Sequence, residues 1–387
     1  MSFIFAQFLN LIPRYEFQKI VNKYKGDFKT RNFNCWNQFV CMIFGQIRGE
    51  RSLREIHRSI NSHLSKLYHI GIKECPKSTL SDANEKRDFR IYEEFAKYLM
   101  LIAQKEYMNT ELSLDITNAI YALDASTIDL CLSLFDWAKF RKRKGAVKLH
   151  TMIDLKGNIP VFLNITDGKT HDIKAVGELP IEENAIYVMD RGYVDFSWLM
   201  KFNHAKSFFV TRLKTNINYC RILSYSSDKS VGIKSDQEIK LVSDRLKERY
   251  PLKLRRVSFH DDIKKKNLVF LTNNFELPAI IIADIYKARW QIELFFKWIK
   301  QNLKIKTFYG YSQNAVKTQL WISMIVYLLI SIIKERYKVD LASSAMLHII
   351  EGNLFENKPL LLLFMNRKRE TKNKTKFEQL NLFDFLS

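Results

Sequence analysis

The chain of 387 residues is long enough for two or three domains, and its 47% hydrophobic residues with only 7 prolines and 12 glycines exclude a largely disordered protein. Lysine and arginine outnumber aspartate and glutamate by 62 to 41, which gives a formal net charge of +21. An excess of this size favours a polyanionic partner, and we expect that partner to be nucleic acid.

Residues 1–115 are predicted to be helical. Two capping-box patterns, at 52–55 (SLRE) and 79–82 (TLSD), each precede apolar residues at helical spacing, and the second helix is expected to continue through Phe95. Several arginines and lysines give this region positive charge. We interpret it as a domain that binds DNA ends. The alternative is a basic helical bundle that only packs on a catalytic core.

Two short apolar runs each lead to an aspartate. Residues 120–123 precede Asp124, and residues 185–189 precede Asp190. Each run has the composition of a buried strand, and the end of such a strand is where a fold can expose an acid. One run alone would usually be a strand that stops at a turn-favouring aspartate. Two of them, upstream of a helix that carries a third acid, make coincidence less attractive.

From about residue 116 the predicted order is strands first and then alternating helices and strands. The predicted strands are 120–123, 147–154, 159–165, 185–189, 207–212 and 267–272, with a hairpin turn at 156–158 (KGN), and the predicted helices are 172–179 and 194–202. This order matches an α/β core of the ribonuclease-H-like type. The long separation of Asp190 from Glu293 exceeds what such a core requires, so residues 213–266 are interpreted as an insertion.

The segment 286–300 (YKARWQIELFFKWIK) is predicted to form one helix with functional residues on one side. Steps of three, four and seven place Tyr286, Arg289, Glu293 and Lys300 together, beside an apolar stripe that would face a core. A carboxylate ligates hard cations, and guanidinium and ammonium groups hold phosphate, so the combination suits a metal ion over a DNA backbone. The alternative is that Glu293 only pairs with its neighbours one turn away, Arg289 and Lys297.

The spacing Tyr-x2-Arg-x3-Glu-x6-Lys resembles the signature of one group of bacterial insertion-sequence transposases, the insertion-sequence-four family of DDE transposases. The sequence Asp190-Arg-Gly-Tyr193 is similar to the second-aspartate motif of that family, and the resemblance extends over about 121–321. It implies a ribonuclease-H-like fold and a β-rich insertion that contacts the DNA end. It also implies hydrolysis at the element's ends, followed by attack of the freed 3′-hydroxyl on target DNA.

Under this interpretation Asp124, Asp190 and Glu293 are the catalytic residues and the metal ligands. Their donors are all oxygen, which favours Mg²⁺, or Mn²⁺ as a substitute, over zinc. We expect Asp124 to lie between two ions, with Asp190 and Glu293 each on one. Such a pair of ions activates the attacking oxygen and stabilises the leaving oxygen, so no protein nucleophile is needed.

The predicted DNA contacts are Tyr286, Arg289, Lys300, Arg191, Lys142 and Arg143. The first three are expected to position the scissile phosphate without holding the metal. The last two belong to a basic run, 139–148, which contains no acid and is predicted to contact phosphate. A solvated loop is the alternative for this run. His171 follows the third predicted strand, and a lone histidine of this kind more often has a structural role.

The predicted insertion lacks a residue that some relatives use. These relatives hold a flipped base on a tryptophan of the insertion while a DNA hairpin forms, and 213–266 contains no tryptophan. The aromatic residues that could stack on a base instead are Tyr219, Tyr225, Tyr250 and Phe259. Whether this protein forms a hairpin intermediate therefore stays open.

The cysteines and the apolar segments indicate the cellular compartment of the protein. The five cysteines contain no C-x-x-C pair and are interpreted as reduced, buried thiols of an intracellular protein. Residues 3–9 are apolar but lack the features of a signal peptide. The most hydrophobic helix, 321–333, is shorter than a membrane span and is predicted to be a core helix.

The predicted organisation is a helical DNA-end-binding domain over 1–115, a catalytic domain over 116–345 and a helical or mobile C-terminal segment over 346–387. The predicted function is cut-and-paste DNA transposition in the bacterial cytoplasm, at the nucleoid and without a membrane. The expected partners are double-stranded DNA, both terminal inverted repeats and target, and a second copy on paired ends. A metal-dependent nuclease of the same fold and a non-catalytic DNA-binding relative are the alternatives. The presence of all three acids disfavours the latter.

Overall fold

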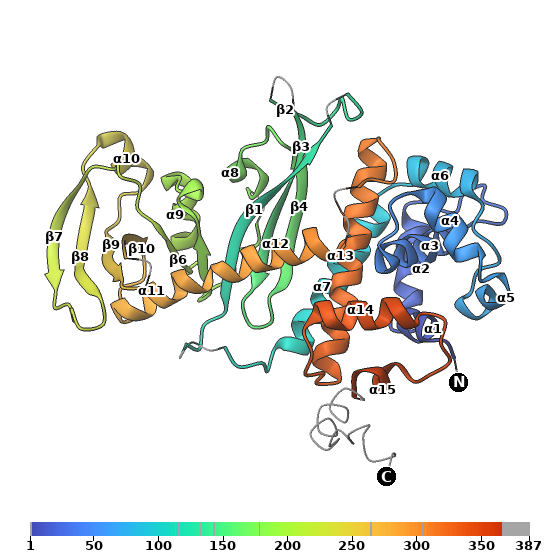
Figure 1. The fold of residues 1–387 in the computed structure, drawn as a ribbon. Helices are drawn as coiled ribbons and strands as arrows, with labels where there is room; N and C mark the ends of the chain where they lie inside the picture. Colours follow the sequence, from blue (N-terminus) through green and yellow to red (C-terminus); the bar gives the residue numbers. More distant parts are fainter. Residues whose placement is uncertain are drawn as a thin grey trace, which may run out of the picture.

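The change from helices to strands occurs where the sequence predicts it. The computed structural model describes residues 2–112, 114, 116–131, 133–141, 144–177, 179–263, 265–303, 305 and 307–365. The helices before the first strand are α1 (Ile4–Leu9), α2 (Arg14–Lys23), α3 (Cys35–Arg48), α4 (Leu53–Asn61), α5 (Leu64–Leu67), α6 (Lys77–Lys86) and α7 (Arg90–Tyr107). They form a helical body at one end of the molecule (Figure 1).

The first capping box is confirmed. The Ser52 hydroxyl accepts a hydrogen bond from the Glu55 backbone N–H at 3.2 Å, and the Glu55 carboxylate accepts one from the Arg51 N–H at 2.6 Å. These bonds satisfy backbone donors that the first turn of α4 cannot pair internally.

The second predicted capping box is wrong, and so is the continuous helix predicted after it. Helix α6 starts directly after Pro76, so Thr79 lies inside it, and the chain breaks before α7 begins. The Asn314 side chain explains the break, because its Nδ2 donates to the carbonyls of Asn84 and Arg87 at 3.1 and 2.7 Å. Its Oδ1 accepts from the Phe89 N–H at 3.1 Å. A residue far away in sequence thus ends one helix and starts the next.

Ten strands form one mixed sheet within the described residues. They are β1 (Ile120–Leu130), β2 (Lys139–Arg141), β3 (Lys144–Asp154), β4 (Ile159–Asp167), β5 (Ile186–Met189), β6 (Phe208–Arg212), β7 (Tyr219–Tyr225), β8 (Ile233–Leu241), β9 (Leu254–Asp261) and β10 (Lys266–Thr272). Their order is β2-β3-β1-β5-β6-β10-β9-β8-β7, with β4 paired to β3. Strands β1, β5 and β6 are parallel, and the other pairs are antiparallel. The predicted insertion is β-rich, but its strands extend the same sheet.

Alternating side chains divide the interior into two cores. Ile120 and Ala122 of β1 pack in a core with α11 (Ala279–Ala288) and α12 (Trp290–Asn302), whereas Tyr121 and Leu123 pack in a second core with α9 (Phe196–His204). Strand β5 divides in the same way. Helices α11 and α12 run end to end across one face of the sheet (Figure 1). Near-continuous apolar runs therefore suit both strands, because each is buried on both faces.

Two local predictions differ from the structure. The helix predicted over 172–179 is a single turn, α8 (Asp172–Ala175). Strand β1 does not end at Asp124 but continues to Leu130, because β3 pairs with it as far as Leu130. What ends near the aspartate is the parallel pairing of β1 with β5.

The β3–β4 hairpin turn, at the predicted position, touches the helical body. Asn158 adopts a positive φ of 57°, and a Cβ atom on Gly157 would lie 2.2 Å from a ring atom of Tyr107 in α7. Only a glycine allows this close approach between the sheet and the helical body.

The predicted core helix is confirmed as α13 (Gln313–Arg336), but the prediction that it is shorter than a membrane span is wrong, because it has 24 residues. It is long and apolar enough to cross a membrane, yet 94% of its most hydrophobic window is buried inside the protein. It packs against α3, α6, α7 and α14 (Ser343–Asn353), and α15 (Leu360–Met365) follows. The rest of the predicted C-terminal segment, 366–387, lies outside the described residues.

All five cysteines are free thiols, but only three are buried as predicted. Cys35, Cys41 and Cys75 lie in the helical body, whereas Cys131 and Cys220 are exposed. Cys220 is exposed because β7 is an edge strand of the sheet.

We expect Asn314→Ala to lower the free energy of unfolding by about 2 kcal/mol, because three hydrogen bonds at the α6–α7 break are lost. Asn353→Ala is the matched control, since its side chain donates only to Ile349 O within its own helix, at 2.7 Å. The control should cost less than about 1 kcal/mol. Urea denaturation followed by circular dichroism measures both, and equal losses would contradict the role given to Asn314.

Candidate active site

The ends of two parallel strands bring the first two acids to one edge. The pairing of β1 with β5 ends at Leu123 and Met189, and Asp124 and Asp190 follow directly. Side chains alternate along extended backbone, so each acid continues the residues that face α11 and α12. The strand register therefore directs both carboxylates to the side of the sheet on which Glu293 lies.

The predicted single helix is two helices that meet at Arg289. This residue ends α11 and starts α12, with helical φ and ψ of −50° and −29°. Its N–H donates to Tyr286 O at 3.3 Å, and its carbonyl accepts from the Ile292 N–H at 3.1 Å. Both hydrogen bonds span three residues, as in a 3₁₀ turn, and the two helices stay nearly in line (Figure 1). The predicted apolar stripe is confirmed as buried: Ile285, Ile292, Phe295, Phe296, Ile299 and Leu303.

The guanidinium of Arg289 joins two of the predicted acids. Nη1 donates to Asp124 Oδ2 at 3.0 Å, and Nη2 donates to Glu293 Oε1 at 2.6 Å. The Arg289 side chain is only 14% exposed, so these contacts are more than surface ion pairs. The alternative interpretation predicts ion pairs of Glu293 with residues one helical turn away, and the pair with Arg289 is present. Lys297 makes no ion pair with Glu293 in the described part of the chain.

The other two signature residues contact Asp190 and strand β1. The Tyr286 hydroxyl donates to Asp190 Oδ1 at 3.4 Å, which is a long bond. Lys300 Nζ donates to the backbone oxygen of Thr127 in β1 at 2.8 Å. The four signature residues and the two aspartates thus form one cluster, although they come from three separate stretches of sequence.

Three negative charges share this cluster, and Asp124 shows their effect. Burial raises the pKa of Asp124 above its ordinary value, and the charges of Asp190 and Glu293 act in the same direction. The Ala125 N–H, which donates to Asp124 Oδ1 at 2.8 Å, and the Arg289 cation oppose that rise in pKa. A bound cation at this position would relieve the repulsion among the carboxylates.

The donors fit a hard divalent cation, but they are not yet gathered around one. All are carboxylate oxygens, the ligands that Mg²⁺ and Mn²⁺ prefer. Among the described residues, no three histidine, cysteine or acidic side chains are close enough together to hold a metal ion. Two of the three acids are instead bonded to Arg289.

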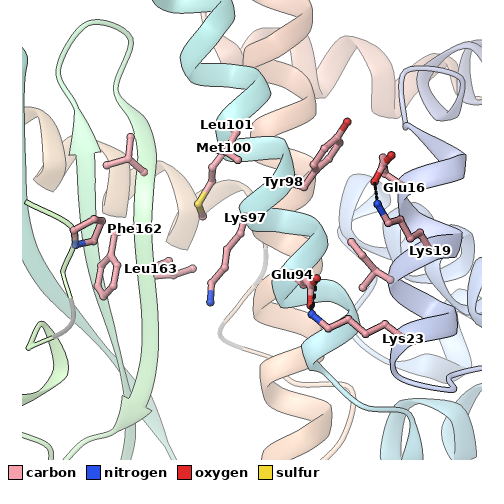
Figure 2. Close-up of a pocket in the computed structure, with 13 residues that line it drawn as sticks. Glu16, Lys19, Lys23, Glu94, Lys97, Tyr98, Met100, Leu101, Phe162 and Leu163 are labelled. Carbon is pink, nitrogen blue, oxygen red and sulfur yellow. Dashed lines mark hydrogen bonds and ion pairs between the residues drawn. The ribbon is translucent and has the colours of Figure 1, made fainter. Parts of the chain in front are cut away.

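A hollow of about 440 Å³ opens beside these acids. Its lining is Asp124, Ala125, Ser126, Glu293, Phe296, Lys297, Lys300 and Gln301. Lys297 is a cation of this hollow that the periodicity argument treats only as an ion-pair partner of Glu293. A larger hollow, of about 590 Å³, lies between α2, α7 and β4 (Figure 2), with an apolar floor and a rim of lysines and glutamates. None of the predicted site residues lines that larger hollow.

The remaining predicted DNA contacts have different outcomes. Arg191 is exposed, directly after Asp190. Lys142 and Arg143 lie outside the described residues. His171 is exposed at the start of α8, and its side chain forms no capping hydrogen bond.

A buried tyrosine near the acids was missed by the sequence reasoning. The hydroxyl of Tyr193 has no hydrogen-bond partner among the described residues. Burial raises its pKa, and the charges of Asp172, Asp124 and Asp190 raise it further. The motif Asp190-Arg-Gly-Tyr193 contains this residue, but nothing in the motif says that the ring turns inward.

Asp172 pairs with Lys148 and lies near His150, both of β3. Its carboxylate lies 3.1 Å from Lys148 Nζ and 3.6 Å from His150 Nδ1. Burial lowers the pKa of His150 to about 4, so this histidine is neutral at pH 7. Lys148, part of the basic stretch of the sequence, is therefore engaged inside the protein.

Two of the four aromatic residues considered for base stacking are unsuitable. Tyr250, which follows α10, and Phe259 of β9 are both buried in the hydrophobic cores of the protein. Tyr225 is 38% exposed and donates to Glu238 Oε2 at 3.2 Å. Tyr219 is half-buried, with the Arg256 guanidinium 5.7 Å from its ring centre.

Comparison with known proteins gives matches over most of the chain. Residues 117–329 match the family of the transposase DDE domain, and residues 1–73 match a family described only as a domain of unknown function. A putative transposase, y4zB, of Sinorhizobium fredii is 31% identical over 288 residues, 73% of this chain and 78% of that protein. A putative transposase for insertion sequence element IS4SA of Synechocystis sp. is 26% identical over 82% of this chain and 88% of that protein.

A further relative and one solved structure complete the comparison. A probable transposase for insertion sequence element IS5377 of Geobacillus stearothermophilus is 29% identical over 66% of this chain and 67% of that protein. The piggyBac transposase synaptic complex with hairpin DNA aligns over 98% of this chain and 86% of that chain, at 9% identity and a TM-score of 0.44. The sequence matches cover the strands and helices that carry the three acids, and the chain belongs to the DDE transposases.

Proposed function

We propose that Mg²⁺, with Mn²⁺ as a substitute, is the divalent ion on which this DNA-cleaving transposase depends, and that Asp124, Asp190 and Glu293 bind it. One observation carries the proposal: strand register and α12 bring these acids to one side of the sheet, where one guanidinium already joins two of them. Three carboxylates directed to one side of a partly buried site favour a bound cation.

We propose that the strands around this site form a ribonuclease-H-like core. The order β4-β3-β1-β5-β6 supports it, with three antiparallel strands followed by two parallel strands and intervening helices. The first two acids then follow neighbouring parallel strands, where an α/β sheet positions its functional groups.

The chain's own residues have separate tasks in this mechanism. The bound metal would activate the attacking oxygen and stabilise the leaving oxygen of the phosphoryl transfer. Arg289 and Lys300 hold oxygens of the scissile phosphate, and Tyr286 orients Asp190 through its hydroxyl. Water is the first nucleophile at the element's end, and the DNA 3′-hydroxyl is the second, at the target.

We further propose that residues 1–115 bind the terminal inverted repeats. Residues 116–345 then carry the chemistry, with 213–266 against the DNA end. Two copies act on paired ends in the cytoplasm. Helix α4 supports the first assignment. It buries Leu53 and exposes Arg54 and Arg58, and Arg51 is exposed just before its N-terminal cap. A row of exposed arginines is suited to phosphate contact.

Replacing any one of Asp124, Asp190 and Glu293 by alanine should lower end cleavage at least about 1,000-fold, because each removes a metal ligand. Binding to the end duplex should persist, as measured by gel shift. Chelation of divalent ions should have the same effect on the unaltered protein. Asp284→Ala is the matched control, since this acid of α11 pairs with Lys287. Cleavage by Asp190→Ala at the control's rate would refute the assignment.

Combined replacement of Arg51, Arg54 and Arg58 by alanine should weaken binding to the end duplex and flatten its salt dependence. Each phosphate contact that is lost should reduce the slope of log affinity against log salt by about 0.9. Arg336→Ala is the control, because Arg336 of α13 pairs with Glu106 of α7. An unchanged slope in the triple variant would remove α4 from the DNA interface.

A further inference from the structure

Both oxygens of the Asp124 carboxylate are already engaged. Oδ1 accepts from the Ala125 N–H at 2.8 Å, and Oδ2 accepts from Arg289 at 3.0 Å. The second guanidinium nitrogen holds Glu293 Oε1 at 2.6 Å. A metal ion that took both acids as ligands would lie beside a guanidinium that is bonded to the same two carboxylates, so the two cations repel each other and compete for these acids.

The contacts of Arg289 leave it able to change partners. Its Nε has no hydrogen-bond partner in the described part of the chain, although it is buried. Its guanidinium carbon lies 5.6 Å from the ring centre of Tyr286, a contact that holds the group beside the acids. An arginine fork matches a phosphate as well as it matches carboxylates.

We propose that Arg289 exchanges partners, as a positioning residue for the reaction. In the protein without DNA it holds Asp124 and Glu293 and keeps them from a metal ion. When a DNA end binds, the guanidinium transfers to a backbone phosphate, and the two carboxylates become free as metal ligands. This inference rests on the proposed metal site and adds a mode of regulation to it.

Exchange of this kind couples the two ligands. A DNA phosphate that draws Arg289 away raises the affinity of the acids for a metal ion, and a metal ion that takes the acids raises the affinity for DNA by the same factor. The protein then binds metal weakly away from DNA, and cleavage is confined to bound ends.

The direction in which the Mn²⁺ affinity changes on replacing Arg289 separates two roles of this residue, exchange of partners and support of the metal ligands. If Arg289 competes with the metal, Arg289→Ala should bind Mn²⁺ more tightly than the unaltered protein. If Arg289 only holds the ligands in place, the same variant should bind Mn²⁺ more weakly. The probe is Mn²⁺ alone, titrated into the full chain without DNA and followed by electron paramagnetic resonance.

Lys297→Ala is the matched control for charge. Lys297 lines the same hollow, so its loss removes one positive charge near the site without breaking the Arg289 contacts. We expect Arg289→Ala to bind Mn²⁺ at least about tenfold more tightly than the unaltered protein, within the usual range of coupling, and Lys297→Ala to change by less than about threefold. An equal effect of the two variants would overturn the exchange.

A duplex with the element's end provides the second measurement. It should raise the Mn²⁺ affinity of the unaltered protein at least about tenfold and leave that of Arg289→Ala unchanged. Arg289→Gln keeps most of the side chain and should behave like the alanine variant if that variant is poorly folded. Equal gains from DNA in all three proteins would contradict the proposal.

Asp124→Ala distinguishes this inference from the metal site on which it rests. If Mn²⁺ binding survives in Asp124→Ala, the assignment of the acids fails. If binding is lost there but Arg289→Ala gains no affinity, the acids hold the metal and only the exchange is wrong.

Discussion

The alternation of side chains along β1 and β5 is the constraint on which the rest depends. Because both strands are buried on both faces, their odd and even residues belong to different cores. The residues that continue this alternation past the last parallel pair are Asp124 and Asp190. A shift of one residue in either strand would turn its acid toward α9 and away from α12. Apolar packing therefore fixes the direction of the two carboxylates.

Much of the architecture could be predicted from short-range patterns. Apolar runs that end in an acid, the hairpin turn and the core helix are all local signals, and the structure contains each of them. The errors come from contacts distant in sequence. Asn314 breaks a helix that periodicity predicts to be continuous, and β3 extends β1 beyond its aspartate. Neither partner can be recognised from the segment that it changes.

The candidate site shows the same limit at the level of single side chains. Helical spacing correctly groups Glu293 with Arg289, and it supports both the functional and the local interpretation of that pair. The contact with Asp124, which is 165 residues away from Arg289 in sequence, reconciles them: the arginine is an ion-pair partner on its helix and also part of the acidic cluster. The inward ring of Tyr193 has no local signal, because burial depends on the surrounding fold.

Helix α13 has a consequence for how such proteins recombine during evolution. It follows all three acids of the candidate site in sequence, yet it packs against α3, α6 and α7 of the helical body and is buried along most of its length. The region before residue 115 therefore lacks part of its own interior. A hybrid with the first 115 residues of a relative would pair mismatched helix surfaces, so compatible exchange requires the later helices to move together with the first ones. Residues 1–115 and α13 are therefore constrained to evolve as one unit.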